Sequence, residues 1–295
     1  MSPLVRWFAS LRPFSFPASI MPVLLAAGLA TGRGTASWWL LPLYLLAAVL
    51  FHAGTNVLND YYDFRHGVDG PDDRDPTHTL TQGVVTPRFM LVTGNLYFVL
   101  GLLLGTGISL VRGPLFFAFG LAGAAGAYFY TGARFSLKYQ ALGDLTVFLL
   151  MGPALVLLGE WALTGTATPR AALACLPQAF LVTAILHGNN LRDLRTDASA
   201  GVSTVAGLLG DRGSRLLLAT LFVLALVSQI ALAAFGLVPP LSLIALAGLA
   251  PAVLIVRTVF HAEDAADLLE LPKWCAGIHL LHGLLYGGAI LIAAL

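Results

Sequence analysis

Two clusters of acidic and amide side chains are the residues here whose types and spacing could do chemistry. The first reads Asn-Val-Leu-Asn-Asp-Tyr-Tyr-Asp over residues 56–63, and the second reads Asn-Asn-Leu-Arg-Asp-Leu-Arg-Thr-Asp over residues 189–197. Both contain Asn-x-Leu-x-Asp followed by another Asp three or four residues later, a weak internal repeat. Side chains at these spacings share a helix face, so each cluster predicts a stack of oxygen ligands. The stacked residues are Asn56, Asp60, Asp63, Asn189, Asp193 and Asp197.

Such stacks are unfavourable unless a cation binds to them. Like charges at these spacings repel, and the C-terminal end of a helix is the wrong end of the dipole for anions. Carboxylate and amide oxygens suit Mg²⁺, which typically takes one or two carboxylates together with phosphate oxygens and waters. We therefore expect the two clusters to face each other and to hold Mg²⁺ and a diphosphate. The alternative is that both are solvated helix ends.

Composition indicates which elements position these clusters. Hydrophobic residues make up 58% of the 295-residue chain, charged residues only 11%, and mean hydropathy is +0.83. Soluble domains carry about 25% charged residues, so these values exclude a soluble globule, and they also exclude a disordered chain. The net charge of +1 gives no argument for nucleic acid as a partner. We expect an all-α, polytopic membrane protein, with one transmembrane domain over residues 1–295.

Nine segments have the roughly 20 mostly apolar residues that a membrane span needs. They are residues 14–32, 37–58, 88–111, 114–132, 142–162, 170–188, 214–236, 238–257 and 274–294. The first could instead be a cleaved signal peptide, but Pro13, Pro17 and Pro22 favour a retained helix that begins irregularly. The prediction is nine transmembrane helices around a central cavity.

Charge is distributed unequally between the two sides that nine spans define. Of the 16 basic residues, 13 fall on the side that holds the N-terminus and loops 59–87, 133–141 and 189–213, and every acidic residue except Glu160 falls there too. The positive-inside rule places this side in the cytoplasm. We expect a multi-pass protein of the cell (inner) membrane, with its N-terminus, cavity opening and active site on the cytoplasmic side.

The two acidic motifs resemble those of the UbiA superfamily of membrane prenyltransferases. Asn-Asp-Tyr-Tyr-Asp at 59–63, with Asn56 before it, and Asp193-x-x-x-Asp197 carry the resemblance. Three further stretches also match. They are Tyr-Thr-Gly at 130–132, Leu-Lys-Tyr at 137–139 with Leu-Gly-Asp at 142–144, and the weaker Arg12-Pro13. The resemblance covers essentially the whole chain, and the family's nine helices agree with the nine predicted segments.

The resemblance implies a Mg²⁺-dependent enzyme that transfers a polyprenyl group from polyprenyl diphosphate to an aromatic acceptor and releases diphosphate. Gly67 and Asp69 after the first motif, and the stretch Gly188 to Asp193, look most like the 1,4-dihydroxy-2-naphthoate prenyltransferases of menaquinone synthesis. Menadiol, 4-hydroxybenzoate and homogentisate are the alternative acceptors. The expected partners are polyprenyl diphosphate, the aromatic acceptor and the lipid bilayer, and no nucleic acid.

The resemblance also assigns roles to single residues. The expected metal ligands are Asn56, Asp60, Asp63, Asp193 and Asp197, with Asp69 in second rank. The expected diphosphate contacts are Asn56, Lys138, Asn189 and Arg192, and the residues expected to act in catalysis are Asp60, Tyr130, Lys138 and Asp193. Three rings are candidates to stabilise an allyl cation through their faces: Tyr61, Tyr62 and Phe148.

Several of these residues have plainer alternative interpretations. Arg192 could be a counter-ion to the neighbouring aspartates, Lys138 a positive-inside anchor, and Tyr61 and Tyr62 part of an interfacial aromatic belt. The histidines preceding each cluster, His52 and His187, are interpreted as packed or hydrogen-bonded helix residues. Cys175 and Cys275 are interpreted as buried, small apolar residues.

Two other classes of membrane protein are possible rivals. Secondary transporters have paired repeats and charges near the membrane midplane, whereas the acids here cluster at one surface, which favours a one-sided active site. Phosphatidyl-type alcohol transferases carry a Gly-x-x-x-Asp-x-x-x-Asp run after Asp-Gly-x-x-Ala-Arg, and this sequence has no such run.

Overall fold

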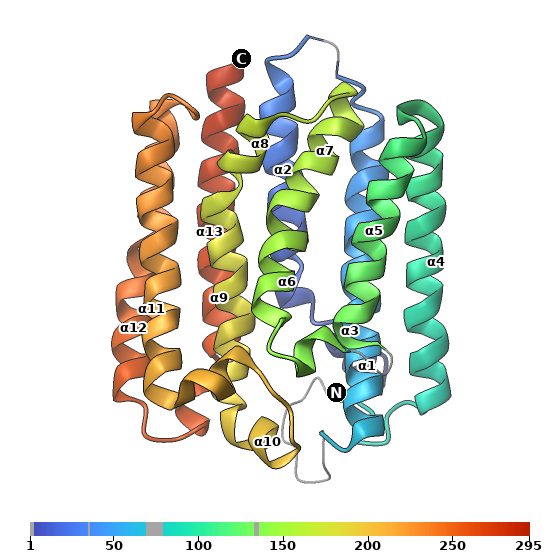
Figure 1. Ribbon diagram of the computed structural model, residues 1–295, viewed down its shortest axis with the longest axis vertical. Helices are drawn as coiled ribbons and strands as arrows, with labels where there is room; N and C mark the ends of the chain where they lie inside the picture. The colour runs from blue at the N-terminus through green and yellow to red at the C-terminus, as the bar shows by residue number, and fades with distance from the viewer. Residues whose placement is uncertain (1–2, 35, 69–78, 133–135) are drawn as a thin grey trace.

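The computed structural model describes residues 3–34, 36–68, 79–132 and 136–295 (Figure 1). Within these ranges the chain is helical apart from short connections and an isolated β-bridge between Gln140 and Ser203. The predicted all-α class is therefore confirmed. Asp69, the second-rank metal ligand, lies outside the described residues.

The helices follow the predicted segments closely. In the N-terminal half they are α1 (Pro3–Ser10), η1 (Pro13–Ser15), α2 (Pro17–Thr31), α3 (Leu40–His66), α4 (Pro87–Arg112), α5 (Pro114–Thr131) and η2 (Leu137–Tyr139). A continuous run follows, made of α6 (Gly143–Leu149), the π-helical η3 (Leu150–Ala154) and α7 (Leu155–Thr164). The remainder are α8 (Pro169–Ala174), α9 (Leu176–Arg192), α10 (Leu194–Ser199), α11 (Val205–Ala234), η4 (Pro240–Leu249), α12 (Ala250–His261), η5 (Ala266–Leu268) and α13 (Leu271–Ala294).

Proline begins many of these helices. It occupies one of the first two positions of α2, α4, α5, α8, α9, α12 and α13. Proline suits this place because the first N–H groups of a helix have no intrahelical acceptor in any case. Between α4 and α5 the chain reverses at Gly113, whose φ of 89° favours glycine. The predicted boundaries near residues 112–114 therefore agree with the structure to within two residues.

Among the described residues, seven helical segments are long and apolar enough to cross a membrane. They are Leu40–His66, Pro87–Arg112, Pro114–Thr131, Gly143–Thr164, Val205–Ala234, Pro240–His261 and Ala266–Ala294. An eighth is added if Trp7–Ser15 and Pro17–Thr31, bent by 45°, form one span. The predicted span 170–188 corresponds to α8 and α9, which are interrupted at Cys175, and α9 has 17 residues. The number nine thus stays a prediction.

Two helices extend well beyond the predicted apolar segments. α3 continues from the apolar residues through the first acidic cluster to His66, where Gly67 at φ 72° ends it. α11 begins at Val205, nine residues before the predicted span, and is kinked at Gly210. Hydropathy locates the part of a helix inside the membrane, whereas backbone hydrogen bonding continues into the polar region beyond it.

The long helices run side by side along one axis, and the polar connections gather at its ends (Figure 1). α2 packs against α3, α7 and α13, and α9 packs against α11 and α13. Close approach of α3 and α4 depends on small residues, because a side chain at Gly54 would meet Phe98 and one at Gly94 would meet Leu58. The loop η2, the helix α10 and the N-terminus lie at one end, and α8 and the C-terminus at the other.

Glu160, the acid predicted on the opposite side, has a structural role at that end. Its side chain is 2% exposed and accepts hydrogen bonds from the Thr168 backbone N–H at 2.7 Å and from Arg33 at 2.9 Å. Arg112 donates to the carbonyl groups of Ala162 and Leu163 at the end of α7. These contacts join α4, α7 and α8 away from the acidic clusters.

Candidate active site

The first acidic cluster lies on the last three turns of α3. Because the helix continues to His66, Asn56, Asp60 and Asp63 stack along one side, as their spacing predicts. Asp60 is 1% exposed and Asp63 5% exposed. The Asn56 amide donates to the Leu11 carbonyl at 2.9 Å, which ties this face of α3 to the segment before η1. These carboxylates are therefore withdrawn from bulk solvent and depend on nearby polar groups.

Lys138 binds the outer carboxylate of this cluster. Its Nζ lies 2.6 Å and 2.8 Å from the two oxygens of Asp63, and 2.7 Å from Oδ1 of Asn59. Tyr139 also donates its hydroxyl to Asp63, and Asn59 donates to it at 2.8 Å. Lys138 is on the short helix η2, far along the chain from Asp63, so this contact exists only in the folded molecule.

Arg12 binds the inner carboxylate. Its Nη2 donates to Oδ1 of Asp60 at 2.7 Å. The backbone of Arg12 is left-handed, with φ 52° and ψ 57°, which is uncommon for a residue with a side chain. Both the backbone N–H and the hydroxyl of Ser15 donate to the Arg12 carbonyl and hold this conformation. Unusual backbone geometry of this kind is concentrated at functional sites.

The second acidic cluster lies where α9 meets α10. Arg192 forms a two-pronged contact with Asp193, with Nε and Nη2 each 2.7 Å from a carboxylate oxygen. Asn189 donates to Asp193 at 3.2 Å. The helix is interrupted at Asp193, and Asp197 follows on α10 with its N–H bonded to the Asp193 carbonyl. The predicted stack is therefore continuous from Asn189 to Asp193, and a helix break precedes its last member.

The two clusters face each other, as the sequence predicts. Asp197 is within electrostatic range of Lys138 and Asp63 as well as of Asp193. Burial, followed by the negative charge of Asp193, raises the pKa of Asp197 to about 7. The loop that carries Lys138 is tied to the segment after α10, because Ala141 N–H donates to the Ser203 carbonyl at 2.8 Å. A bound cation would offset the burial and the charge of Asp193 that together disfavour the ionised form of Asp197.

A buried pair of residues connects α6 to the end of α9. His187 Nδ1 lies 2.8 Å from one oxygen of Asp144, and Asn190 donates to the other at 3.2 Å. The second ring nitrogen of His187 lies 3.1 Å from the Ser214 carbonyl on α11. His52 is held between the hydroxyls of Ser15 and Ser19. The interpretation of both histidines as hydrogen-bonded helix residues is confirmed.

The aromatic candidates have different surroundings. Tyr130, at the end of α5, has its ring next to Gly143, where a Cβ would also meet the backbone of Lys138. Tyr62 stacks on His66, which in turn contacts Tyr139 beside Asp63. Tyr61 packs in an apolar cluster with Val57, Leu80 and Met90, and Phe148 packs against Phe180 at a centroid distance of 5.2 Å. The ring that the Lys138 ammonium group faces is that of Tyr139, at 5.1 Å from its centroid.

The donor atoms fit magnesium bound together with a phosphate compound. Among the described residues, no three side chains of Asp, Glu, His or Cys are grouped closely enough to hold a metal ion alone. The carboxylates are instead engaged by Arg12, Lys138 and Arg192. Mg²⁺ is normally bound by one or two carboxylates with phosphate oxygens and waters, and not by an all-protein cage. The site therefore suits a Mg²⁺–diphosphate complex better than a bare ion.

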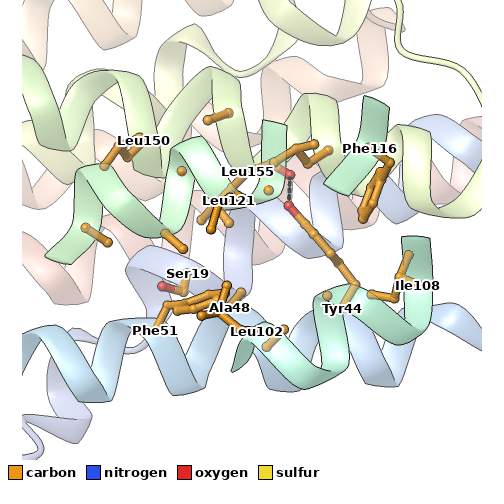
Figure 2. A pocket seen from close by; sticks show the side chains of 18 of the residues that line it. Ser19, Tyr44, Ala48, Phe51, Leu102, Ile108, Phe116, Leu121, Leu150 and Leu155 are labelled. Carbon is orange, nitrogen blue, oxygen red and sulfur yellow. Dashed lines mark hydrogen bonds between the residues drawn. The ribbon is translucent and has the colours of Figure 1, made fainter. Parts of the chain in front are cut away.

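An apolar cavity of about 120 Å³ lies between α3, α4, α5 and the α6–α7 run (Figure 2). Nearly all of its lining is hydrocarbon, and small residues on α3, α4 and α5 provide the space. Tyr44 crosses one part of it and donates its hydroxyl to the Leu155 carbonyl at 2.8 Å. Ser19 in the wall is linked through His52 and Ser15 to Asn56. A chain of three hydrogen bonds thus connects the wall of the cavity to the first acidic cluster.

Sequence reasoning did not assign several residues of this site. Arg12, Asn59, Tyr139 and Asp144 lie within the matching motifs, but no role was predicted for them. Their contacts with Asp60, Asp63 and His187 join segments far apart in the chain. The signal that could have found them is their clustering within short polar stretches of an otherwise apolar sequence.

Comparison with known proteins agrees with the motifs. The model of the UbiA prenyltransferase family matches residues 19–270. The 1,4-dihydroxy-2-naphthoate octaprenyltransferase of Mycobacterium tuberculosis is 34% identical over 226 residues, which is 74% of this chain and 74% of that protein. UbiA prenyltransferase domain-containing protein 1 of Homo sapiens is 31% identical over 296 residues, covering 96% of this chain and 82% of that protein.

Solved structures show the same fold. A UbiA homologue from Archaeoglobus fulgidus bound to DMAPP and Mg²⁺ has a TM-score of 0.62 at 18% identity, over 99% of both chains. The same homologue bound to GPP and Mg²⁺ has a TM-score of 0.59, over 99% of this chain and 100% of that one. The chain belongs to the UbiA prenyltransferase family. It is a multi-pass membrane enzyme that transfers prenyl groups, as its two acidic motifs predicted.

Proposed function

We propose that this protein joins a polyprenyl group from polyprenyl diphosphate to the aromatic acceptor 1,4-dihydroxy-2-naphthoate, with Mg²⁺ as cofactor, and releases diphosphate. The observation that carries the proposal is a cluster of charged side chains connected by hydrogen bonds to the wall of an apolar cavity. A prenyl diphosphate has the same two-part character, because a densely charged head is bonded to a long hydrocarbon chain. The site therefore complements the donor substrate in both polarity and arrangement.

The diphosphate head is held by basic and amide side chains around the two clusters. Lys138 and Arg192 form charge-assisted hydrogen bonds with phosphate oxygens, Arg192 as a two-pronged donor and Lys138 as a point charge. Asn56 and Asn189 add amide donors. The metal is held by Asn56, Asp60, Asp63, Asp193 and Asp197.

The hydrocarbon chain occupies the cavity between α3, α4 and α5 (Figure 2). The first isoprene units of the donor fill this space, and the rest of a longer chain continues toward lipid. An apolar cavity also keeps water from the reacting carbon, where it would quench the allyl cation.

The reaction breaks the allylic carbon–oxygen bond and joins the carbon to the aromatic ring. The ring then becomes aromatic again by losing carbon dioxide where the attacked carbon carries the carboxylate of dihydroxynaphthoate, or a proton where it carries hydrogen. Bound Mg²⁺ would neutralise the negative charge that grows on the leaving diphosphate. Lys138 contributes to the same stabilisation through a contact that strengthens as the bond breaks. Tyr130, whose ring lies next to Gly143 at the start of α6, contacts the diphosphate through its hydroxyl or faces the cation with its ring.

The proposed identity of the aromatic acceptor and the proposed orientation in the membrane are supported by different observations. The identity of 34% to the dihydroxynaphthoate octaprenyltransferase of M. tuberculosis supports 1,4-dihydroxy-2-naphthoate and a place in menaquinone synthesis. The distribution of basic residues supports a cytoplasmic active site in the cell (inner) membrane. We also propose that residues 1–295 form one transmembrane domain, since both clusters and the cavity draw on helices from both halves of the chain.

The purified protein in lipid nanodiscs tests this function directly. It is incubated with geranylgeranyl diphosphate, Mg²⁺ and, in separate reactions, dihydroxynaphthoate, menadiol, 4-hydroxybenzoate or homogentisate. We expect diphosphate release that requires both Mg²⁺ and acceptor, with a prenylated product mass for dihydroxynaphthoate. Product with a different acceptor would replace the proposed one, and no acceptor-dependent diphosphate release with any of them would overturn the proposal.

A further inference from the structure

Each of three acidic side chains in the site is paired with a basic side chain, which is distant in sequence for Asp60 and Asp63 and is the preceding residue for Asp193. Arg12 binds Asp60 at 2.7 Å, Lys138 binds Asp63 at 2.6 Å, and Arg192 binds Asp193 at 2.7 Å. The exposed fractions of the basic side chains are 17%, 17% and 12%. The groups proposed to hold the metal and those proposed to hold the diphosphate therefore satisfy one another when neither is bound.

We propose that substrate binding is an exchange of partners: the basic side chains move from the aspartates to the diphosphate, and the freed aspartates then bind Mg²⁺. This inference rests on the proposed function, because it assumes that Mg²⁺ and diphosphate share the site. It adds Arg12 to the diphosphate-binding residues and assigns Lys138 a second role, as a competitor of the metal. The closed ion pairs hold the charged groups in place until the donor arrives.

The exchange favours binding of Mg²⁺ and diphosphate together, because neither ligand alone can compensate both the aspartates and the basic side chains. Mg²⁺ by itself must displace a cation from each carboxylate and would leave buried or half-buried basic side chains without an anion. Diphosphate by itself draws the cations away and leaves carboxylates without compensation, which is costly when they are buried. When both bind, every charge is matched again. The two ligands are thus expected to bind cooperatively, and the coupling must be equal in both directions.

Lys138 offers the cleanest test because its removal does not strip Asp63 of all partners. Asn59 and Tyr139 still donate to Asp63 after Lys138→Gln, so the carboxylate keeps its position while losing its cation. The exchange then predicts opposite changes in two affinities. Mg²⁺ alone should bind more tightly than in the unmodified protein, because no cation has to be displaced, and diphosphate without metal should bind more weakly.

Calorimetric titration of the full chain in nanodiscs measures both affinities. Mg²⁺ is added without diphosphate, and inorganic diphosphate is added in the presence of a chelator. We expect Lys138→Gln to tighten Mg²⁺ binding about tenfold and to weaken diphosphate binding about tenfold, each equivalent to about 1.4 kcal/mol. Lys138→Arg should leave both constants near those of the unmodified protein. Arg12→Gln should repeat the pattern at Asp60.

Arg195→Gln is the matched control. Arg195 is exposed and lies two residues before Asp197, so its removal takes away one positive charge near the site without breaking an aspartate ion pair described above. Salt-screened charge at that place should change Mg²⁺ affinity by less than about twofold. If Arg195→Gln tightens Mg²⁺ binding as much as Lys138→Gln does, general electrostatics explains the effect and the exchange is wrong.

The remaining outcomes distinguish failure of the proposed exchange from failure of the proposed prenyltransferase function. Weaker diphosphate binding with unchanged Mg²⁺ affinity in Lys138→Gln would overturn the exchange and leave Lys138 as a simple diphosphate contact. If the unmodified protein binds no diphosphate even at saturating free Mg²⁺, the proposed function fails as well. Cooperative binding of the two ligands, lost in Lys138→Gln and kept in Arg195→Gln, supports both.

Discussion

At the scale of single residues, the site is defined by carboxylates that carry compensating cations. Asp60 and Asp193 come from different helices, and among the described residues Asp60 pairs with Arg12 and Asp193 with Arg192. A buried or half-buried carboxylate held in this way is unusual as a purely structural feature at two facing helix ends, because simpler polar residues would be cheaper to bury. The arrangement is typical of groups kept ready for a charged ligand.

Replacing either aspartate should remove activity without unfolding the protein. Asp60→Ala and Asp193→Ala each leave the diphosphate without part of its metal bridge, so turnover of donor and acceptor at saturating Mg²⁺ should fall by at least about a hundredfold, or roughly 2.7 kcal/mol of barrier. Asp211→Ala, an exposed aspartate of α11 paired with Arg215, is the control and should stay near full activity. Substantial turnover by either site variant would contradict the two-cluster model.

His187 allows a test of how the end of α9 is held. Its Nδ1 contacts Asp144 and its Nε2 contacts the Ser214 carbonyl. Asparagine reproduces a donor near Nδ1, whereas glutamine reproduces one near Nε2. If the Asp144 contact positions Asn189 and Arg192, His187→Gln should lower kcat by about tenfold, about 1.4 kcal/mol, and His187→Asn should lose less. Equal kcat values for the two variants would assign His187 a packing role only.

At the scale of elements, glycine on α4 creates room that the apolar cavity uses. Gly105 lines the cavity, and a Cβ added there would meet no atom within 4 Å. Gly107 lies on the same helix, has the same open surroundings and is not part of the cavity lining. Substitutions at these two glycines therefore distinguish the effect of filling the cavity from a general effect on α4.

Gly105→Leu should impair long donors selectively. The added side chain enters the space proposed for the hydrocarbon chain, so KM for geranylgeranyl diphosphate should rise about tenfold, while KM for dimethylallyl diphosphate should change little. Gly107→Leu should leave both KM values unchanged, and both variants gain helix propensity. The comparison is made by measuring diphosphate release with the two donors. An equal effect of Gly105→Leu on both donors would place the hydrocarbon chain elsewhere.

At the scale of the whole molecule, the charged site and the Glu160 cluster lie at opposite ends of the bundle (Figure 1). One end carries nearly all of the polar chemistry, and the other holds α4, α7 and α8 together. This separation means that changes at one end should leave the other intact. It also allows the orientation in the membrane to be tested with single cysteines.

Ala200→Cys and Ala167→Cys should be labelled from opposite sides of the membrane. Both positions are exposed, the first after α10 and the second before α8, and the natural cysteines are buried. Because basic residues are concentrated on the side of α10, a membrane-impermeant thiol reagent should reach position 200 only from the cytoplasm and position 167 only from outside. Labelling of position 200 in intact cells would show that the protein has the opposite orientation in the membrane.

The sequence by itself determined the features that depend on neighbours along the chain. Apolar segments define the helices because a helix in lipid must satisfy its own backbone. The stacking of Asn56, Asp60 and Asp63 follows from residues three and four apart lying on one helix face. The one-sided distribution of charge also follows from counting residues between spans. Each of these needs only local spacing.

The tertiary structure decided which charged residues meet. Arg12 reaches Asp60 across 48 residues and Lys138 reaches Asp63 across 75, and no local pattern specifies such distant contacts. It also decided that α9 is interrupted at Asp193, which separates Asp197 from the straight stack that the spacing predicts. The cavity arises where small residues of α3, α4 and α5 fail to fill the space between helices. Such a void depends on how three helices pack together, so it becomes visible only when their side chains are placed in one structure.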